Sequence, residues 1–183
     1  TVGATTGSTI DKSFNGFAST TSGGVVANAG SLNVVDSVFY NNTAATNGGV
    51  INNTGTAIVS NSTFSTNTAT AGNGGAINNT NSLTMTGTKT FINNTAVSGG
   101  AIANSSTANI TGANFTDNTA TTGNGGAISN TGAITFTNAN FTNNTATAGQ
   151  GGAIYSTGTV NLVATGTNTS TFSGNTAGGI SNA

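Results

Sequence analysis

Five side chains in this sequence carry a formal charge, and any acid-base chemistry would have to start from them. They are Asp11, Lys12, Asp36, Lys89 and Asp117. The chain has no His and no Cys, which excludes zinc, copper, haem and iron-sulfur sites of ordinary type and leaves no Ser-His or Cys-His nucleophile. General acid or base catalysis would therefore fall to the three aspartates.

These charges do not form a catalytic group. The three aspartates occupy different phases of the repeat described below, so no two of them are stacked on neighbouring turns, and Lys89 has no carboxylate in its own phase. Hydrolysis of a glycoside, for example, needs two carboxylates that flank one bond. We therefore expect no catalytic residue, no cofactor-binding residue and no metal ligand. The charges are interpreted as solvated surface points, and the chain as non-enzymatic.

The low charge also limits the partners. Lys and Arg together number two, too few to neutralise a phosphate backbone, so nucleic acid is excluded as a ligand. No apolar run approaches the roughly 18 residues that a membrane-spanning helix needs. Thr, Asn, Ser and Gly dominate the rest of the chain, which offers few sites to proteases that cut after Lys or Arg. These features favour an extracellular or cell-surface location.

A repeated motif indicates how the remaining residues are arranged. Gly-Gly followed by small or branched apolar residues returns at intervals of 25 to 27 residues. The first glycines of the seven copies are Gly23, Gly48, Gly74, Gly99, Gly125, Gly151 and Gly178. So regular a period indicates that each repeat buries its apolar face only against its neighbours. We assign one domain over 1–183, with six repeats in 23–177 between incomplete coils in 1–22 and 178–183.

Apolar and polar columns alternate with period two inside each repeat, which is typical of strands with one buried face and not of helices. Three such segments occur in each repeat. The sequence therefore predicts an all-β fold, a single right-handed parallel β-helix (a β-solenoid) of about seven coils with three short strands per coil. Under the Gly-Gly strand we expect a core ladder of Ile51, Ile77, Ile102, Ile128 and Ile154.

The third segment of each repeat carries Phe-x-x-Asn-x-Ala. We expect its phenylalanines to stack in the core, and they are Phe39, Phe64, Phe91, Phe115, Phe141 and Phe172. The asparagine three residues later is expected to turn inward at a corner, where its amide can bond the asparagines above and below. The members of this predicted ladder are Asn42, Asn67, Asn94, Asn118, Asn144 and Asn175.

The pairing of Gly-Gly-Ala-Ile with Phe-x-x-Asn resembles the repeat signature of the chlamydial polymorphic outer membrane proteins, in their autotransporter passenger regions. Gly-Gly-Ala-Ile is intact at 74–77, 99–102, 125–128 and 151–154, and Phe-x-x-Asn occurs in all six repeats. The resemblance covers residues 23–180. It implies a β-helix of this type and an adhesive or structural role at a cell surface.

Neither end of the sequence has the polar cap that normally closes a solenoid. The N-terminal segment, beginning with Thr1 and Val2, is predicted to supply later strands of a coil but no first strand. Gly178, Gly179 and Ile180 are predicted to begin a coil that is not finished. We expect copies of the chain to complete each other's coils and to form a head-to-tail homopolymer. The same ends would result from a piece cut out of a longer tandem array.

Ice binding is the alternative interpretation of the surface. Outward columns of the second strand hold Thr84, Thr86, Asn109, Thr111, Thr135 and Thr137, and a separate column holds Thr43, Thr68, Thr95, Thr119, Thr145 and Thr176. Regular threonines on a flat solenoid face resemble the ice-binding surfaces of antifreeze proteins, although Thr is common on any neutral exposed strand. A host-surface or glycan ligand is also open, and the sequence does not identify one.

Overall fold

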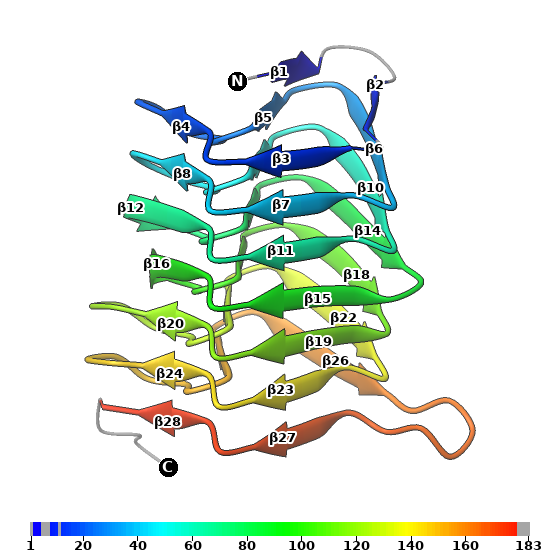
Figure 1. The fold of residues 1–183 in the computed structure, drawn as a ribbon. Coiled ribbons are helices and arrows are strands. Elements are labelled where there is room, and N and C mark those ends of the chain that lie inside the picture. The colour runs from blue at the N-terminus through cyan, green and yellow to red at the C-terminus, as the bar shows by residue number, and fades with distance from the viewer. Residues whose placement is uncertain (1, 5–7, 11, 179–183) are drawn as a thin grey trace.

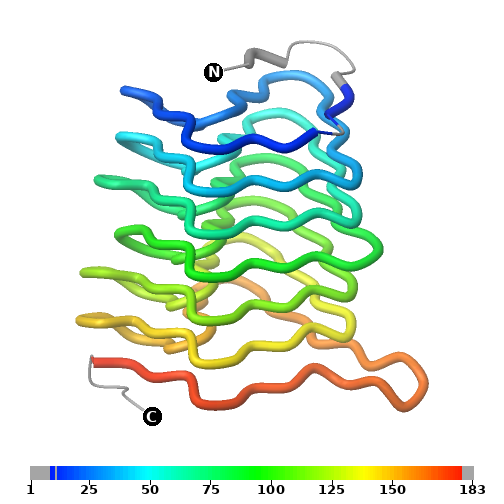
Figure 2. The backbone as a smooth tube through the Cα atoms, in the orientation of Figure 1, coloured from blue at the N-terminus to red at the C-terminus, as the bar shows by residue number. Residues whose placement is uncertain are grey.

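The computed structural model describes residues 2–4, 8–10 and 12–178, and within them it contains strands, turns and bends but no helix. Figure 1 shows a stack of coils, with β1 at one end of the stack and β28 at the other. Each coil contributes one strand to each of four parallel sheets of seven strands. The predicted all-β parallel solenoid is therefore confirmed. Viewed from the N-terminal end, the chain turns clockwise as it recedes, so the solenoid is right-handed (Figure 2).

The four sheets are named A to D in the order in which the chain meets them. Sheet A contains β1 (Val2–Ala4), β5 (Val26–Asn28), β9 (Ile51–Asn53), β13 (Ile77–Asn79), β17 (Ile102–Asn104), β21 (Ile128–Asn130) and β25 (Ile154–Ser156). Sheet B contains β2 (Ser8–Ile10), β6 (Ser31–Val35), β10 (Thr56–Ser60), β14 (Ser82–Thr86), β18 (Thr107–Thr111), β22 (Ala133–Thr137) and β26 (Thr159–Val163). Sheet C contains β3 (Ser13–Asn15), β7 (Val38–Tyr40), β11 (Thr63–Ser65), β15 (Lys89–Ile92), β19 (Ala113–Thr116), β23 (Asn140–Thr142) and β27 (Thr171–Ser173). Sheet D contains β4 (Ala18–Ser19), β8 (Thr43–Ala44), β12 (Thr68–Asn73), β16 (Thr95–Ser98), β20 (Thr119–Ala120), β24 (Thr145–Ala146) and β28 (Thr176–Ala177). Coil 1 comprises β1 to β4, and coil 7 comprises β25 to β28.

The prediction of three strands per coil is wrong, because each coil has four. The Phe-x-x-Asn segment, expected to be one strand, is divided between sheets C and D by a residue with left-handed backbone geometry. In coil 2 this residue is Asn41, with φ of 56°, and in coil 5 it is Asp117, with φ of 54°. Asn and Asp adopt this conformation more readily than other non-glycine residues, and the change of direction ends one strand and starts the next.

The N-terminal segment also differs from its prediction. β1 pairs in parallel with β5, with Val2 opposite Val26. A first strand is therefore present in coil 1, and the prediction that this segment lacks one is wrong.

The interior is built from like residues stacked one coil apart. Every strand of sheet C pairs so that its phenylalanine lies opposite the phenylalanine of the next coil, as in Phe64 with Phe39 and with Phe91. The rings are parallel, with neighbouring centroids 4.8 to 5.3 Å apart. Phe14 of coil 1 is a seventh member of this stack. Sheet A places its isoleucines opposite each other in the same way.

Two ladders of buried asparagines close the corners. Between sheets C and D, the side-chain amide of each Asn of the Phe-x-x-Asn motif donates to the side-chain oxygen of the next at 2.9 to 3.0 Å. A second ladder lies between sheets A and B, with donor–acceptor distances of 2.6 to 2.8 Å, and was not anticipated from the sequence. Its members are Asn28, Asn53, Asn79, Asn104 and Asn130, and it ends on the hydroxyl of Ser156. Both ladders hold the coils in register without charge.

The Gly-Gly motif forms the corner that leads into sheet A. Gly48 has φ of 65°, a conformation that side chains disfavour. The following Gly49 faces the coil below so closely that a Cβ atom on it would lie 2.0 Å from the carbonyl oxygen of Gly75. The motif repeats because each coil passes its neighbour at this distance.

Candidate functional site

Asp36 and Asp117, two of the three candidate acid-base residues, lie at corners of the solenoid. Asp36 lies in the turn between β6 and β7 with φ of 47°, and Asp117 lies in the turn between β19 and β20 with φ of 54°. They occupy different corners of coils 2 and 5, and both are exposed. Asp11 lies outside the described residues. The structure therefore brings no two of the described carboxylates together, and the left-handed backbone accounts for Asp at both positions.

Lys89 is the exception to the prediction of solvated charges, because its side chain is fully buried. It lies at the start of β15, in the column of Ser62 and Ala113. Its Nζ donates to the carbonyl oxygen of Gly87 at 2.8 Å and to that of Thr111. Burial lowers the pKa of Lys89 from its ordinary value of 10.5 to about 8. Two backbone acceptors make the buried ammonium tolerable without a carboxylate.

The lowered pKa of Lys89 predicts a pH-dependent stability. The unfolded chain holds this proton more tightly than the folded chain. Below pH 8 the folded protein therefore bears the full cost of burying a charged lysine, and above about pH 10.5 that cost disappears because Lys89 is neutral in both states. We expect the free energy of unfolding to rise by about 2 to 3 kcal/mol over that interval relative to Lys89→Met. Urea denaturation of both proteins at pH 7, 9 and 10.5 measures the difference, in which titration of the other groups cancels. Parallel pH profiles for the two proteins would contradict it.

The predicted core residues lie where the sheets enclose them. Phe39, Phe64, Phe91, Phe115 and Phe141 and the isoleucines of coils 3 to 6 have no exposed surface. Phe172 and Ile154 belong to coil 7, where no further coil covers them within the described residues, and Phe172 is 47% exposed. The phenylalanine and isoleucine ladders hold the rod together, so only the outward columns are accessible to a ligand.

The proposed ice-binding columns lie side by side on sheet B. Thr84 pairs with Asn109, which pairs with Thr135, while Thr111 pairs with Thr137. Both columns continue into apolar residues, with Ile58 beside Thr84 and Val163 beside Thr137. The threonines of sheet D form a longer ladder. They pair without interruption in the order Thr43, Thr68, Thr95, Thr119, Thr145 and Thr176.

Both ends of the described stack present apolar side chains. In coil 7, Leu162 is 50% exposed and Phe172 47%, whereas Phe136 and Phe141 of coil 6 are fully buried. In coil 1, Phe17 takes the place of a ladder Asn and packs its ring edge on Phe14, with the centroids 5.8 Å apart. Of the residues predicted to mediate assembly, Gly178 follows β28, and Val2 is described only as backbone in β1. Thr1, Gly179 and Ile180 lie outside the described residues.

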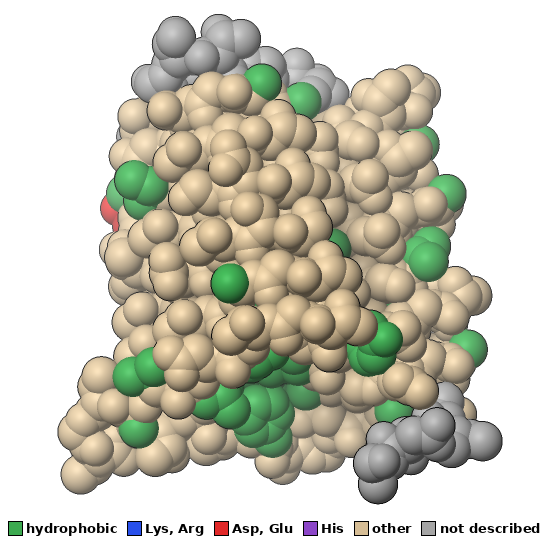
Figure 3. Space-filling view, turned by 180° about the vertical axis from the view of Figure 1, so that it is seen from behind, with side chains coloured by type: hydrophobic (Ala, Val, Ile, Leu, Met, Phe, Trp, Pro, Cys, Tyr) green, Lys and Arg blue, Asp and Glu red, His purple; other side chains and the backbone are tan. Residues whose placement is uncertain are grey.

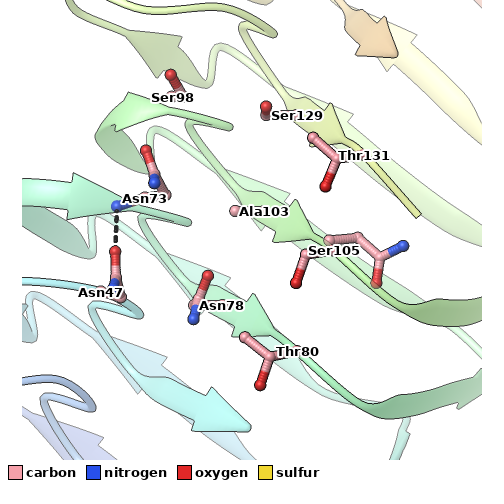
Figure 4. A pocket seen from close by; sticks show the side chains of 10 residues that line it. Asn47, Asn73, Asn78, Thr80, Ser98, Ala103, Ser105, Ser129 and Thr131 are labelled. Atoms are coloured by element: carbon pink, nitrogen blue, oxygen red, sulfur yellow. Dashed lines mark hydrogen bonds between the residues drawn. The ribbon is translucent and has the colours of Figure 1, made fainter. Parts of the chain in front are cut away.

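A hollow of about 290 Å³ opens on the outward side of sheet A. Figure 4 shows Asn47, Asn73 and Ser98 on one side of it, Thr80, Ser105 and Thr131 on the other, and Asn78, Ala103 and Ser129 between them. Every one of these residues is uncharged. The lining is therefore a concave surface of amides and hydroxyls with one small apolar residue, Ala103, at its centre.

Two local departures from the repeat accompany this hollow. Between the Ala of Phe-x-x-Asn-x-Ala and the next Gly-Gly lie four residues in 70–73 and in 121–124, but only Val97 and Ser98 in the coil between them. The floor of the hollow is part of the outward column of sheet A, which contains Asn52, Asn78, Ala103, Ser129 and Tyr155. Ala103, the smallest of these side chains, lies beside the short segment of Val97 and Ser98. A shortened wall and a small floor residue together leave the space. The shorter segment can be counted in the sequence, but its position beside Ala103 cannot.

Within the described residues, no three His, Cys, Asp or Glu side chains are grouped so that they could hold a metal ion. Residues 2–4, 8–10 and 12–178 include no helix of the length and apolarity needed to span a membrane.

The Chlamydia polymorphic membrane protein (Chlamydia_PMP) repeat family matches this chain four times, at residues 36–54, 90–105, 112–131 and 138–157. These four segments are similar to the polymorphic membrane protein repeat. Each matched segment begins near sheet C, passes the Phe-x-x-Asn corner and the Gly-Gly corner, and ends beyond sheet A. The expected resemblance to the chlamydial repeats is thus confirmed.

The motif residues of the four matched segments are internal. In the first matched segment, Phe39, Asn42, Ile51 and Asn53 have no exposed surface. The match therefore describes how the coil is built, whereas any ligand would meet the outward columns. Neither the curated proteins nor the solved structures gave a match to this chain.

Proposed function

We propose that this chain is a non-enzymatic structural or adhesive rod at a cell surface and that copies of it stack head to tail. The polymorphic membrane protein repeats and the β-solenoid fold fit a surface structural or adhesive protein. The repeat type also supports association with the outer membrane or the cell surface. The placement of the described charges at separate corners and in the interior supports a role without catalysis.

The exposed core at the two ends is the observation that carries the stacking proposal. Leu162 and Phe172 continue the interior columns of the solenoid but are half exposed. Phe14 and Phe17 present an apolar surface at the opposite end of the Phe stack. A second copy placed in register would cover one surface with the other and pair the open strand edges of coils 7 and 1. Because the two surfaces differ, the contact does not close on itself and produces an open filament.

Substitution at the exposed end tests this stacking. Leu162→Asp would place an unpaired carboxylate in the contact, so we expect the protein concentration needed for assembly to rise by at least about tenfold. Asn161→Asp adds the same charge one residue away on the exposed side of β26 and serves as the matched control. Analytical ultracentrifugation and negative-stain electron microscopy measure the assembly. A monomer without fibres at all concentrations would refute the stacking, as would equal assembly by both variants.

Ice binding is a second candidate, favoured by the uninterrupted threonine ladder on sheet D. Six threonines recur there once per coil, with a spacing near 4.8 Å. The columns on sheet B support this function less, since Ile58 and Val163 interrupt them. Thermal hysteresis of the purified protein distinguishes the candidates, because a rod without ice affinity leaves the freezing point at its colligative value.

A further inference from the structure

We propose that the hollow on sheet A is a binding site for an uncharged glycan chain that lies along the axis of the rod. This inference goes beyond the structural role above and does not depend on end-to-end stacking. It rests on the shape of the hollow, on the hydrogen-bonding groups that it leaves unused, and on the absence of charge from its lining.

The shape of the hollow suits a chain rather than a compact ligand. Its two sides are rows of residues that repeat once per coil, with Asn47, Asn73 and Ser98 facing Thr80, Ser105 and Thr131 (Figure 4). Successive coils are separated by about 4.8 Å, so these rows present polar groups at a fixed spacing along roughly 10 Å of the axis. A ligand with hydroxyl groups on both edges can bond both rows at once.

Several polar groups in the hollow are available to a ligand. Within the described chain, the hydroxyls of Ser129 and Thr131 and the side-chain amide of Asn73 make no hydrogen bond. Other groups in the walls are fixed by internal bonds, since Asn47 accepts from the backbone N–H of Asn73 at 2.8 Å and the Thr80 hydroxyl donates to the carbonyl oxygen of Asn53 at 3.1 Å. The site therefore combines pre-ordered walls with free donors and acceptors.

The chemistry of the lining selects a neutral glycan over other polymers. None of the residues that line the hollow is charged, and Figure 3, which views this side of the molecule, shows no Lys or Arg side chain. The strands beneath the hollow are paired on both sides within sheet A, so no open edge is offered to an extended peptide. The small Ala103 at the centre leaves no deep apolar pocket for a peptide side chain. Sugar hydroxyls, which both donate and accept, match the hydroxyls and amides present.

Filling the hollow tests the proposal without disturbing the core. Ala103→Tyr introduces at the floor the residue that position 155 of the same outward column already carries. Ala27→Tyr makes the same change in that column outside the hollow and is the matched control. Cellohexaose, maltohexaose and chitohexaose are the ligands, with binding measured by isothermal titration calorimetry and saturation-transfer NMR. We expect at least one to bind, with affinity reduced at least about tenfold by Ala103→Tyr and unchanged by Ala27→Tyr.

Removal of single hydroxyls provides a second measurement that does not depend on the larger substitution. Thr131→Val keeps the shape of the side chain and deletes its hydroxyl, and we expect it to weaken binding several-fold with an unchanged melting temperature. Thr157→Val is the equivalent change outside the hollow, on exposed Thr157 of coil 7.

Four outcomes would overturn the assignment. They are no binding by any of the three hexaoses, equal binding by Ala103→Tyr and wild type, equal binding of an uncharged Ser- and Asn-rich peptide, and tighter binding of heparin that is lost as salt is raised. Filament formation is scored separately by microscopy, so failure here leaves the stacking proposal intact.

Discussion

Phe115→Ala is expected to lower the free energy of unfolding by about 3 to 5 kcal/mol. The Phe115 ring is fully buried and stacks between Phe91 and Phe141, with centroids 4.9 Å away on both sides. Its edge also meets Phe136 at 6.3 Å. Because strands above and below fix the backbone, the surrounding rings cannot close the space that the deletion leaves. The loss therefore includes both the burial of the ring and the cost of the cavity.

Two controls separate the stack from the strand that carries it. Thr116→Ala changes the next residue of β19, which points outward, and should cost less than about 1 kcal/mol. Phe172→Ala deletes the same ring at the end of the stack, where it is 47% exposed, and should cost clearly less than Phe115→Ala. Urea denaturation followed by circular dichroism measures all three. Comparable effects for Phe115 and Thr116 would contradict the inward stack.

Asn118→Ala is the second substitution with a large expected effect, about 3 to 5 kcal/mol. The side chain of Asn118 accepts from both the backbone N–H and the side-chain amide of Asn94, each at 3.0 Å. Its own amide donates to the carbonyl oxygen of Phe91 and to the side-chain oxygen of Asn144. Alanine leaves the Asn94 N–H and the Phe91 carbonyl buried without this partner. Each such group costs about 1 to 3 kcal/mol.

Asn114→Ala is the matched control for this ladder. Asn114 lies on β19 of the same coil but is partly exposed, and it accepts one hydrogen bond, from the Asn140 side chain at 2.9 Å. Water can replace that bond, so the expected cost is below about 1 kcal/mol. Thermal melting of both variants measures the difference. If Asn118→Ala melted at the wild-type temperature, the corner asparagines would contribute nothing to cohesion.

The repeat spacing and the alternation of apolar columns were sufficient to predict a parallel β-solenoid from the sequence. The Phe-x-x-Asn motif also predicted which residues would stack. The number of strands per coil was not predictable from alternation, because the division of that segment depends on the left-handed backbone of residues such as Asn41. The same corner geometry explains Asp117 without a chemical role. The second asparagine ladder had a signal in the sequence, since Asn recurs at Asn28, Asn53 and Asn79 two residues after the first apolar residue of each sheet A strand.

Lys89 and the hollow show why the candidate sites were harder to predict than the fold. Lys89 lies two residues before Phe91 in a buried column, so the alternation along β15 points it inward. The sequence did not show the carbonyl oxygens of Gly87 and Thr111 that accept from its ammonium group, and Thr111 belongs to the next coil. The hollow depends on the short segment of Val97 and Ser98 before Gly99, compared with the longer segments before Gly-Gly in the coils on either side. Neither property belongs to a single repeat.

The sequence by itself determined how the coils of this protein stack within the chain. Side chains one repeat apart must lie over one another when the coils have nearly the same length. Only the tertiary structure decided what the regular columns leave open: the carbonyl partners of the Lys89 ammonium, the exposed core at Leu162 and Phe172, and the hollow around Ala103. The physical reason is that a uniform period fixes which residues meet inside the coil, whereas the outer surface is set by small differences in length between coils that become neighbours only after folding.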